Sequence, residues 1–197
     1  MRKTAFLFIV VGVVLLCIGG YQHFRNQLSE KQAMIEANEM LAESTQSVTT
    51  KEMAVSAEEA IEDFKPETGE TVGILEIPVL NAELPIIEGT DPDELEKGVG
   101  HYRNSAYPLQ SDQIVLSGHR DTVFRNLGKL KIGDTFTMKL PYGEFEYQMV
   151  NSKIVAEDDT SIIKSTAPNE ELVITTCYPF SYVGNATKRY IIYAKPV

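Results

Sequence analysis

The pattern of hydrophobic and polar positions divides the chain into three parts. From Ala5 to Ile18 every residue is apolar or glycine, and no charge occurs between residues 4 and 20. Over residues 21–68 the apolar positions form only a weak helical stripe. From residue 69 onward, short apolar runs alternate with turn residues. The pattern predicts an N-terminal apolar segment, then a spacer, then a compact domain over residues 69–197.

The apolar segment has the features of a single-pass membrane anchor. Its 17 uncharged residues, at about 1.5 Å per residue in a helix, just span a ~30 Å hydrocarbon layer. Arg2 and Lys3 precede it, which places residues 1–3 in the cytoplasm. A cleaved signal peptide is the alternative, but the run is long for one and YQHFRNQ follows it in place of a cleavage site. We expect a transmembrane helix over residues 4–20, with the rest of the chain extracellular.

Residues 21–68 have the composition of a spacer. They carry ten acidic and four basic residues, and a serine- and threonine-rich run at 44–50 interrupts the helical stripe. Because so little apolar surface is available to offset the entropy of ordering, we expect a frayed helix or a disordered spacer. An adhesive coiled-coil stalk is the alternative, but no sustained heptad supports it.

Residues 69–197 are predicted to fold as an all-β domain. Thr135–Leu140 alternates, and the segment after a Pro-Tyr-Gly turn alternates again, which is typical of a hairpin. One short helix is expected between a capping Asp91 and Gly98. We therefore expect a β-barrel of about eight strands with short helices. The runs with strand character are Val72–Ile77, Ala82–Ile87, Gln113–Gly118, Thr135–Leu140, Glu144–Val155, Glu171–Thr176 and Arg189–Lys195.

Charge and cysteine content exclude several classes of protein. The formal net charge of −10 argues against a surface that binds nucleic acid. Two cysteines are too few for a disulfide-dense scaffold or a multi-cysteine metal site. Cys17 lies in the predicted anchor, so it cannot pair with Cys177. A lone exported thiol is a candidate nucleophile.

Three residues at strand ends have the chemistry of a cysteine-dependent acyl transfer. His119 follows one predicted strand, Cys177 follows another, and Arg189 opens the last, so all three can share one rim of a barrel. An imidazole can take the proton of a thiol and return one to a leaving amine, while a guanidinium stabilises a developing oxyanion. Ordinary structural roles for each residue are the alternative. His101 has no obvious partner and is interpreted as structural.

Longer motifs around these residues resemble a known family. LSGHRDTVFRNLGKLKIGD surrounds His119, and LVITTCYPFSYVGNATKRYIIYAKP contains Cys177 and then Arg189 twelve residues later. EIPVLNAELPIIEGT and LEKGVGHY are further similar stretches. Together they resemble the class D sortases of Gram-positive bacteria over about 130 residues, and the N-terminal anchor fits that architecture. The resemblance implies a sortase-like β-barrel preceded by a transmembrane helix and a spacer.

The resemblance also implies a membrane-anchored cysteine transpeptidase. Cys177 corresponds to the nucleophile, His119 to the general acid and base, and Arg189 to the ligand of the oxyanion or substrate carbonyl. The implied substrates are surface proteins with an LPxT-type C-terminal sorting signal, cleaved after Thr and before Ala or Ser. The implied acceptor is an amine of peptidoglycan or of its lipid-linked precursor. No cofactor is implied, and a calcium site is not expected because Asp112 is the only carboxylate in HYRNSAYPLQSDQ.

The substrate groove is predicted along residues 156–171. Ile162 and Ile163 are expected to contact the Leu and Pro of the signal, and Thr176 is a further predicted substrate contact; a mobile surface loop is the alternative for 156–171.

Two other functions stay open. A secreted cysteine endopeptidase is disfavoured because papain-like enzymes place the Cys ahead of the His. A non-catalytic wall-binding module predicts that the three strand-end residues lie apart.

Overall fold

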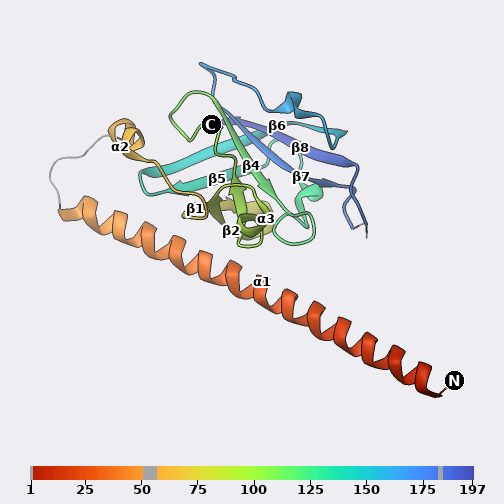
Figure 1. Cartoon of the computed structure of the whole chain (residues 1–197). Helices are drawn as coiled ribbons and strands as arrows, with labels where there is room; N and C mark the ends of the chain where they lie inside the picture. The colour runs from red at the N-terminus through yellow and green to blue at the C-terminus, as the bar shows by residue number, and fades with distance from the viewer. Residues whose placement is uncertain (1, 51–56, 182–183) are drawn as a thin grey trace.

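The computed structural model describes residues 2–50, 57–181 and 184–197. Across these residues eight strands close into a barrel in the order β1-β2-β3-β4-β7-β8-β6-β5 (Figure 1). The fold class expected from the sequence is confirmed. The strands are β1 (Thr71–Ile77), β2 (Ala82–Glu88), β3 (Val99–His101), β4 (Gln113–Gly118), β5 (Thr135–Leu140), β6 (Gly143–Ala156), β7 (Glu171–Tyr178) and β8 (Lys188–Pro196).

Alternation of apolar and polar side chains accounts for the strands and their pairing. In β5 the side chains of Phe136, Met138 and Leu140 are buried, and the intervening residues are partly exposed. β5 pairs antiparallel with β6, as the hairpin pattern predicted, and β1 pairs antiparallel with β2. One hydrophobic cluster fills the barrel interior. Every strand contributes at least two residues to it, except β3, which contributes Val99 alone. Its members include Leu75, Ile86, Leu116, Phe136, Tyr147, Leu172, Ile174 and Ile192.

Helices lie on the outside and at the ends of this barrel. α1 passes along the side formed by β1 and β2, and short 3-10 turns occupy three of the loops (Figure 1). The helices and turns are α1 (Arg2–Thr50), α2 (Ala57–Asp63), α3 (Pro92–Leu95), η1 (Pro78–Leu80), η2 (Leu127–Lys129) and η3 (Thr160–Ile162).

Three local expectations differ from the structure. β7 continues to Tyr178, so Cys177 lies within the strand and not after it. β3 was not predicted, because three residues are too few to show an alternating pattern. α3 ends at Leu95, and the Asp91 side chain makes no capping hydrogen bond; only its backbone position at the helix start was predicted correctly.

The predicted spacer contains more structure than its composition indicated. α1 continues through the serine- and threonine-rich run to Thr50, where an interruption was expected. Ala33 and Ala37 lie one helical turn apart and are 3% and 0% exposed, because their small side chains let the helix approach β1 and β2 closely. The Thr71 hydroxyl also donates to Glu36 at 3.0 Å. Part of this segment therefore packs on the domain and does not simply extend away from it.

Packing also reaches past the boundary predicted at residue 69. Ile61 of α2 is buried in the main hydrophobic cluster. The Phe64 ring meets the rings of Tyr107 and Tyr142 edge-on, at centroid distances of 5.0 and 5.1 Å. Residues 61–64 therefore close one side of the core.

Within the described part of the chain, no helix combines the length and the apolar character needed to cross a membrane. The transmembrane helix expected over residues 4–20 stays a prediction.

Candidate active site

Strand register brings the three strand-end residues together at one rim of the barrel. β4 and β7 are parallel neighbours, and Gly118 pairs with Thr176, so His119 and Cys177 are the next residues on adjacent strands. β7 and β8 are antiparallel neighbours in which Cys177 pairs directly with Arg189. Cys177 therefore lies between the other two. The backbones of the three residues are therefore neighbours at this rim.

Alternation places Cys177 on the outer face of the sheet. Leu172 and Ile174 of β7 belong to the main core, whereas Val173 belongs to a second hydrophobic cluster with Val115 and Ile191. Successive side chains of a strand point to opposite faces, so Cys177 shares the face of Val173. Cys177 is partly buried and not in a disulfide. The outer face on this side of the thiol is apolar, and its central residues are buried beneath side chains that include Ile162 and Tyr193.

The Arg189 guanidinium is held by the chain around it. It donates to the carbonyl oxygens of Ala186 and Lys188 at 3.0 and 3.1 Å, and its nearest carboxylate is Glu157 at 3.7 Å. No hydrogen bond joins the described side chains of Cys177, His119 and Arg189 to one another. His119 is exposed to solvent. The described side chains of the three residues are thus not joined to each other by hydrogen bonds.

The predicted substrate contacts fall in different places. Ile162 packs against the second hydrophobic cluster, on the same outer face as Cys177. Ile163 is 38% exposed and lies outside that cluster. Thr176 is 3% exposed, and its hydroxyl donates to Gly118 O at 2.7 Å, which ties β7 to β4 just before His119. The structure thus brings Ile162 to the candidate groove and turns Thr176 toward the barrel interior.

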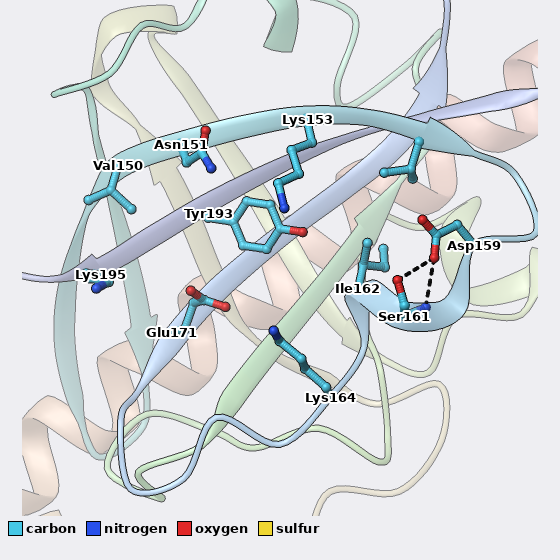
Figure 2. A pocket seen from close by; sticks show the side chains of 11 residues that line it. Val150, Asn151, Lys153, Asp159, Ser161, Ile162, Lys164, Glu171, Tyr193 and Lys195 are labelled. Carbon is cyan, nitrogen blue, oxygen red and sulfur yellow. Dashed lines mark hydrogen bonds between the residues drawn. The ribbon is translucent and has the colours of Figure 1, made fainter.

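A cavity of about 430 Å³ opens on this outer face, between β6, β8 and the β6–β7 loop (Figure 2). Val155, the cross-strand partner of Arg189, and Ile162 line its apolar end. Asp159 lies beside Ile162, whereas Lys164, Lys195 and Glu171 lie toward the other end, with Lys153 and the Tyr193 ring between them (Figure 2). The cavity therefore continues the candidate groove away from the catalytic rim.

Asp112 fixes the loop that forms one wall of this cavity. Its carboxylate accepts hydrogen bonds from Thr166 N at 2.6 Å, Ser165 Oγ at 2.9 Å and Ala167 N at 3.2 Å. The hydrogen bond from the Thr166 amide has the largest effect on the pKa of Asp112, and that from the Gln113 amide follows. Together they hold this pKa below its ordinary value. Sequence reasoning considered this carboxylate only as a metal ligand and missed its role as a loop anchor.

Arg120 is a second residue that sequence reasoning missed. It follows His119 directly, it is only 7% exposed, and its guanidinium donates to Pro179 O at 3.1 Å and Gly184 O at 2.8 Å. It thus joins the loop after β4 to the loop between β7 and β8, on both sides of Cys177. In the sequence, the feature that could have indicated Arg120 is a basic residue directly after a candidate catalytic histidine.

His101 is buried in a network that explains its structural role. Its Nδ1 lies 2.7 Å from Glu88 Oε2, and the Tyr107 hydroxyl donates to the same oxygen at 2.6 Å. The other ring nitrogen faces Ala106 O at 3.0 Å. The interpretation of His101 as structural fits this burial. Among the described residues, no three His, Cys, Asp or Glu side chains are grouped so that they could hold a metal ion.

Comparison with known proteins identifies the family of this barrel. The model of the sortase domain matches residues 75–197. The chain belongs to the sortase family. It is also 53% identical to Sortase D of Bacillus subtilis over 198 residues, which covers 100% of both sequences. The resemblance of this sortase to class D enzymes is thereby confirmed.

Solved sortase structures share the fold. A Clostridium perfringens Sortase D5 transpeptidase superposes with a TM-score of 0.66 at 24% identity, covering 82% of this chain and 98% of that one. Sortase C from Clostridium perfringens SM101 gives 0.60 at 26% identity, with 86% and 89% covered. The sortase described here is therefore a cysteine transpeptidase, which cleaves a peptide bond and transfers the acyl group.

Proposed function

We propose that Cys177 is the nucleophile of this transpeptidase, with His119 as general acid and base and Arg189 as the oxyanion ligand. The observation that carries the proposal is the register of β4, β7 and β8, which places Cys177 between His119 and Arg189. The Cys177 side chain also shares the outer sheet face with Val173 of the second hydrophobic cluster, and its cross-strand partner Arg189 pairs on the other side with Val155, which lines the cavity. A thiol, an imidazole and a guanidinium supply the three functions that acyl transfer needs.

In the proposed reaction, the Cys177 thiolate attacks the carbonyl carbon of the scissile bond and forms a tetrahedral intermediate. The carbon–nitrogen bond then breaks, His119 gives a proton to the departing amine, and a thioester remains. An acceptor amine attacks the thioester carbonyl, and His119 takes the proton that this amine loses. Collapse of the second intermediate forms the new amide and releases Cys177.

Arg189 needs a change of partner to stabilise the oxyanion. Its guanidinium now donates to the carbonyl oxygens of Ala186 and Lys188. A negatively charged oxyanion is a better acceptor than a neutral carbonyl oxygen, so the guanidinium is expected to turn toward it as charge develops. The loose 3.7 Å approach of Glu157 costs little to give up.

The proposed substrate is an LPxT-type sorting signal of a surface protein, cleaved after Thr and before Ala or Ser. The apolar outer face beside Cys177, with Ile162 at its edge, supports a site for the Leu and Pro side chains. For Thr176 we propose a positioning role in place of substrate contact, because its hydroxyl ties β7 to β4 beside His119. The proposed acceptor is an amine of peptidoglycan or of its lipid-linked precursor.

We also propose that residues 4–20 anchor this sortase in the cell membrane with the barrel outside. The uncharged apolar stretch and the preceding Arg2 and Lys3 support this topology. Separation of membrane and soluble fractions, followed by protease treatment of whole cells, tests it. Protection of the barrel from an external protease would contradict the orientation.

Incubation of the full-length chain with an LPxTA peptide and an amine acceptor tests the enzymatic proposal. We expect cleavage after Thr, a thioester on Cys177 by mass spectrometry, and a transpeptidation product whose amount rises with acceptor concentration. Hydrolysis alone, unaffected by added amine, would identify an endopeptidase.

Matched variants separate the three proposed roles. Cys177→Ala is expected to abolish both thioester and product. Arg189→Lys keeps the charge but loses the planar pair of donors, so it is expected to lower kcat by about 10²–10³-fold, as loss of an oxyanion donor does. Cleavage of the peptide by the Cys177→Ala chain would overturn the assignment of the nucleophile.

A further inference from the structure

The far end of the groove cavity gathers positive charge on a domain that is acidic as a whole. Residues 69–197 carry 18 acidic and 12 basic residues. The cavity is lined by Lys153, Lys164 and Lys195 against two carboxylates, Asp159 and Glu171. Figure 2 shows Lys153 of β6 and Lys164 of the β6–β7 loop directed toward the space around Tyr193 from opposite sides. This cavity is therefore lined by more basic than acidic side chains, although the domain as a whole is acidic.

The two carboxylates make hydrogen bonds of their own, and the Lys153 ammonium group lies 5.5 Å from the centroid of the Tyr193 ring. The Asp159 carboxylate accepts hydrogen bonds from Ser161 N and Ser161 Oγ, which keep it turned toward its own loop and lower its pKa. Glu171 accepts a hydrogen bond from Gln113 at 3.3 Å. In the described residues, none of the three lysine ammonium groups belongs to an ion pair.

The position of the lysines relative to Cys177 indicates which part of a substrate reaches them. Glu171 and Cys177 are the first and seventh residues of β7, so six steps at about 3.3 Å separate them by roughly 20 Å. An extended peptide has a similar rise per residue. In a signal cleaved after Thr, the Leu lies three residues before that Thr, about 10 Å from the reacting carbon. The Glu171 end of the cavity, where Lys164 and Lys195 lie, is thus about three residues further upstream. Lys153 is level with Thr175 of β7, closer to Cys177, and its ammonium group lies 5.5 Å from the centroid of the Tyr193 ring.

We infer that the cavity formed by Lys153, Lys164 and Lys195 binds an acidic segment of the substrate protein, two to three residues before the Leu of its sorting signal. This inference rests on the proposed function of the same groove. Charge complementarity selects the occupant, since ammonium groups around a partly enclosed cavity favour carboxylates and disfavour the positively charged acceptor amine. The lysines then add a specificity determinant outside the signal itself.

Three peptides that differ only upstream of the signal test this inference on the full-length chain. Each carries the same LPxTA sequence, preceded at the second and third upstream positions by Asp-Glu, Ser-Gln or Lys-Arg. We expect kcat/KM to be about three- to tenfold higher for the acidic than for the neutral peptide, and lowest for the basic one. The preference is expected to shrink at high salt. Equal kcat/KM for all three peptides would overturn the inference.

Matched variants locate the preference. The double variant Lys153→Gln, Lys164→Gln is expected to remove the preference for the acidic peptide, measured as the ratio of kcat/KM for the acidic and the neutral peptide. Lys131→Gln removes one positive charge in place of two. Lys131 lies in an exposed turn before β5, outside the cavity, so this variant is expected to retain the preference. Loss of the preference in Lys131→Gln, or its survival in the double variant, would contradict the assignment.

Binding without turnover distinguishes failure of this inference from failure of the proposed function. Affinities of the three peptides for the Cys177→Ala chain are measured by fluorescence anisotropy. If no peptide is cleaved but the acidic one binds more tightly, the proposed reaction fails and the lysine site stands. If binding is equal, the lysine site fails. Lysine-dependent binding of the chain to vesicles with anionic lipid, without peptide preference, would assign these side chains to a membrane surface and would also overturn the inference.

Discussion

At the scale of single residues, Arg120 shows how the loops around the thiol are held. The guanidinium is buried and donates to Pro179 O and Gly184 O across the β7–β8 loop. Arg120→Ala leaves both carbonyl oxygens without this donor. Because hydrogen bonds to charged groups contribute ~1.5–3 kcal/mol, we expect the free energy of unfolding to fall by about that amount. Urea unfolding of the full-length chain measures it.

The exposed Arg125 supplies a control for Arg120. Among the described residues, the acceptor of its guanidinium is Asp121 O, four residues earlier in the same loop. Arg125→Ala is therefore expected to change the unfolding free energy by less than about 0.5 kcal/mol. Equal effects of the two substitutions would show that Arg120 does not join the loops energetically.

At the scale of elements, Asp112 links the β3–β4 loop to the β6–β7 loop. Asp112→Ala removes the acceptor for Thr166 N, Ser165 Oγ and Ala167 N. The wall of the cavity should then become mobile, so we expect KM for an LPxTA peptide to rise about three- to tenfold, with kcat changed less than KM. Asp158→Asn, which removes a nearby exposed carboxylate, is the matched control and is expected to leave KM unchanged.

The pH dependence of this link follows from the lowered pKa of Asp112. A carboxyl group whose pKa is depressed in the folded state contributes stability above its unfolded pKa, near 4, and loses it as pH falls through the lower folded value. The KM difference between the parent chain and Asp112→Ala should thus stay constant from about pH 5 to pH 9. A difference that disappears near pH 7 would contradict an ionised Asp112 anchor.

Element-level features also show why sequence reasoning found some parts of the fold and missed others. β5 was visible because Phe136, Met138 and Leu140 alternate with polar residues over its whole length. The neighbouring placement of β4 and β7 was not visible, because Gly118 and Thr176 pair across 58 positions of sequence. The candidate site could be anticipated as three strand ends, but its arrangement depends on that register. Loop anchors such as Asp112 leave no periodic pattern to recognise.

At the scale of the whole molecule, ionisation of buried tyrosine side chains is expected to destabilise the folded state at high pH. Burial, with hydrogen bonds to Glu88 and Glu170, raises the pKa of Tyr107 and Tyr147 above the ordinary value. Raised folded pKa values leave stability unaffected below the unfolded pKa, near 10, and reduce it as pH rises further. Each phenol should then lower the unfolding free energy by about 1.4 kcal/mol per pH unit.

Urea unfolding between pH 8 and pH 11 measures this limit. We expect a flat region below about pH 10 and a decline above it. Tyr107→Phe removes one ionisable group, so it should make the decline shallower even though it also lowers stability at neutral pH by leaving Glu88 without the phenolic donor. An unchanged slope in Tyr107→Phe would exclude Tyr107 as a source of the alkaline decline.

The docking of α1 on the barrel is the largest feature that composition failed to predict, and it is open to a direct test. Ala37 is fully buried where the helix meets the domain, so Ala37→Leu adds three carbons to a filled contact. Overpacking of this kind costs about 1–3 kcal/mol, which the helix can avoid by separating from the barrel. The part of α1 after residue 20 is rich in polar residues and loses the packing that stabilises it when it separates, so trypsin should cleave after Lys31 several times faster. Ala42→Leu, at an exposed position of the same helix, should leave that rate unchanged. Equal cleavage rates in the two variants would mean that Ala37 does not hold α1 on the barrel, and would leave Ala33, the Arg25–Glu96 ion pair and the Thr71–Glu36 hydrogen bond among its remaining contacts.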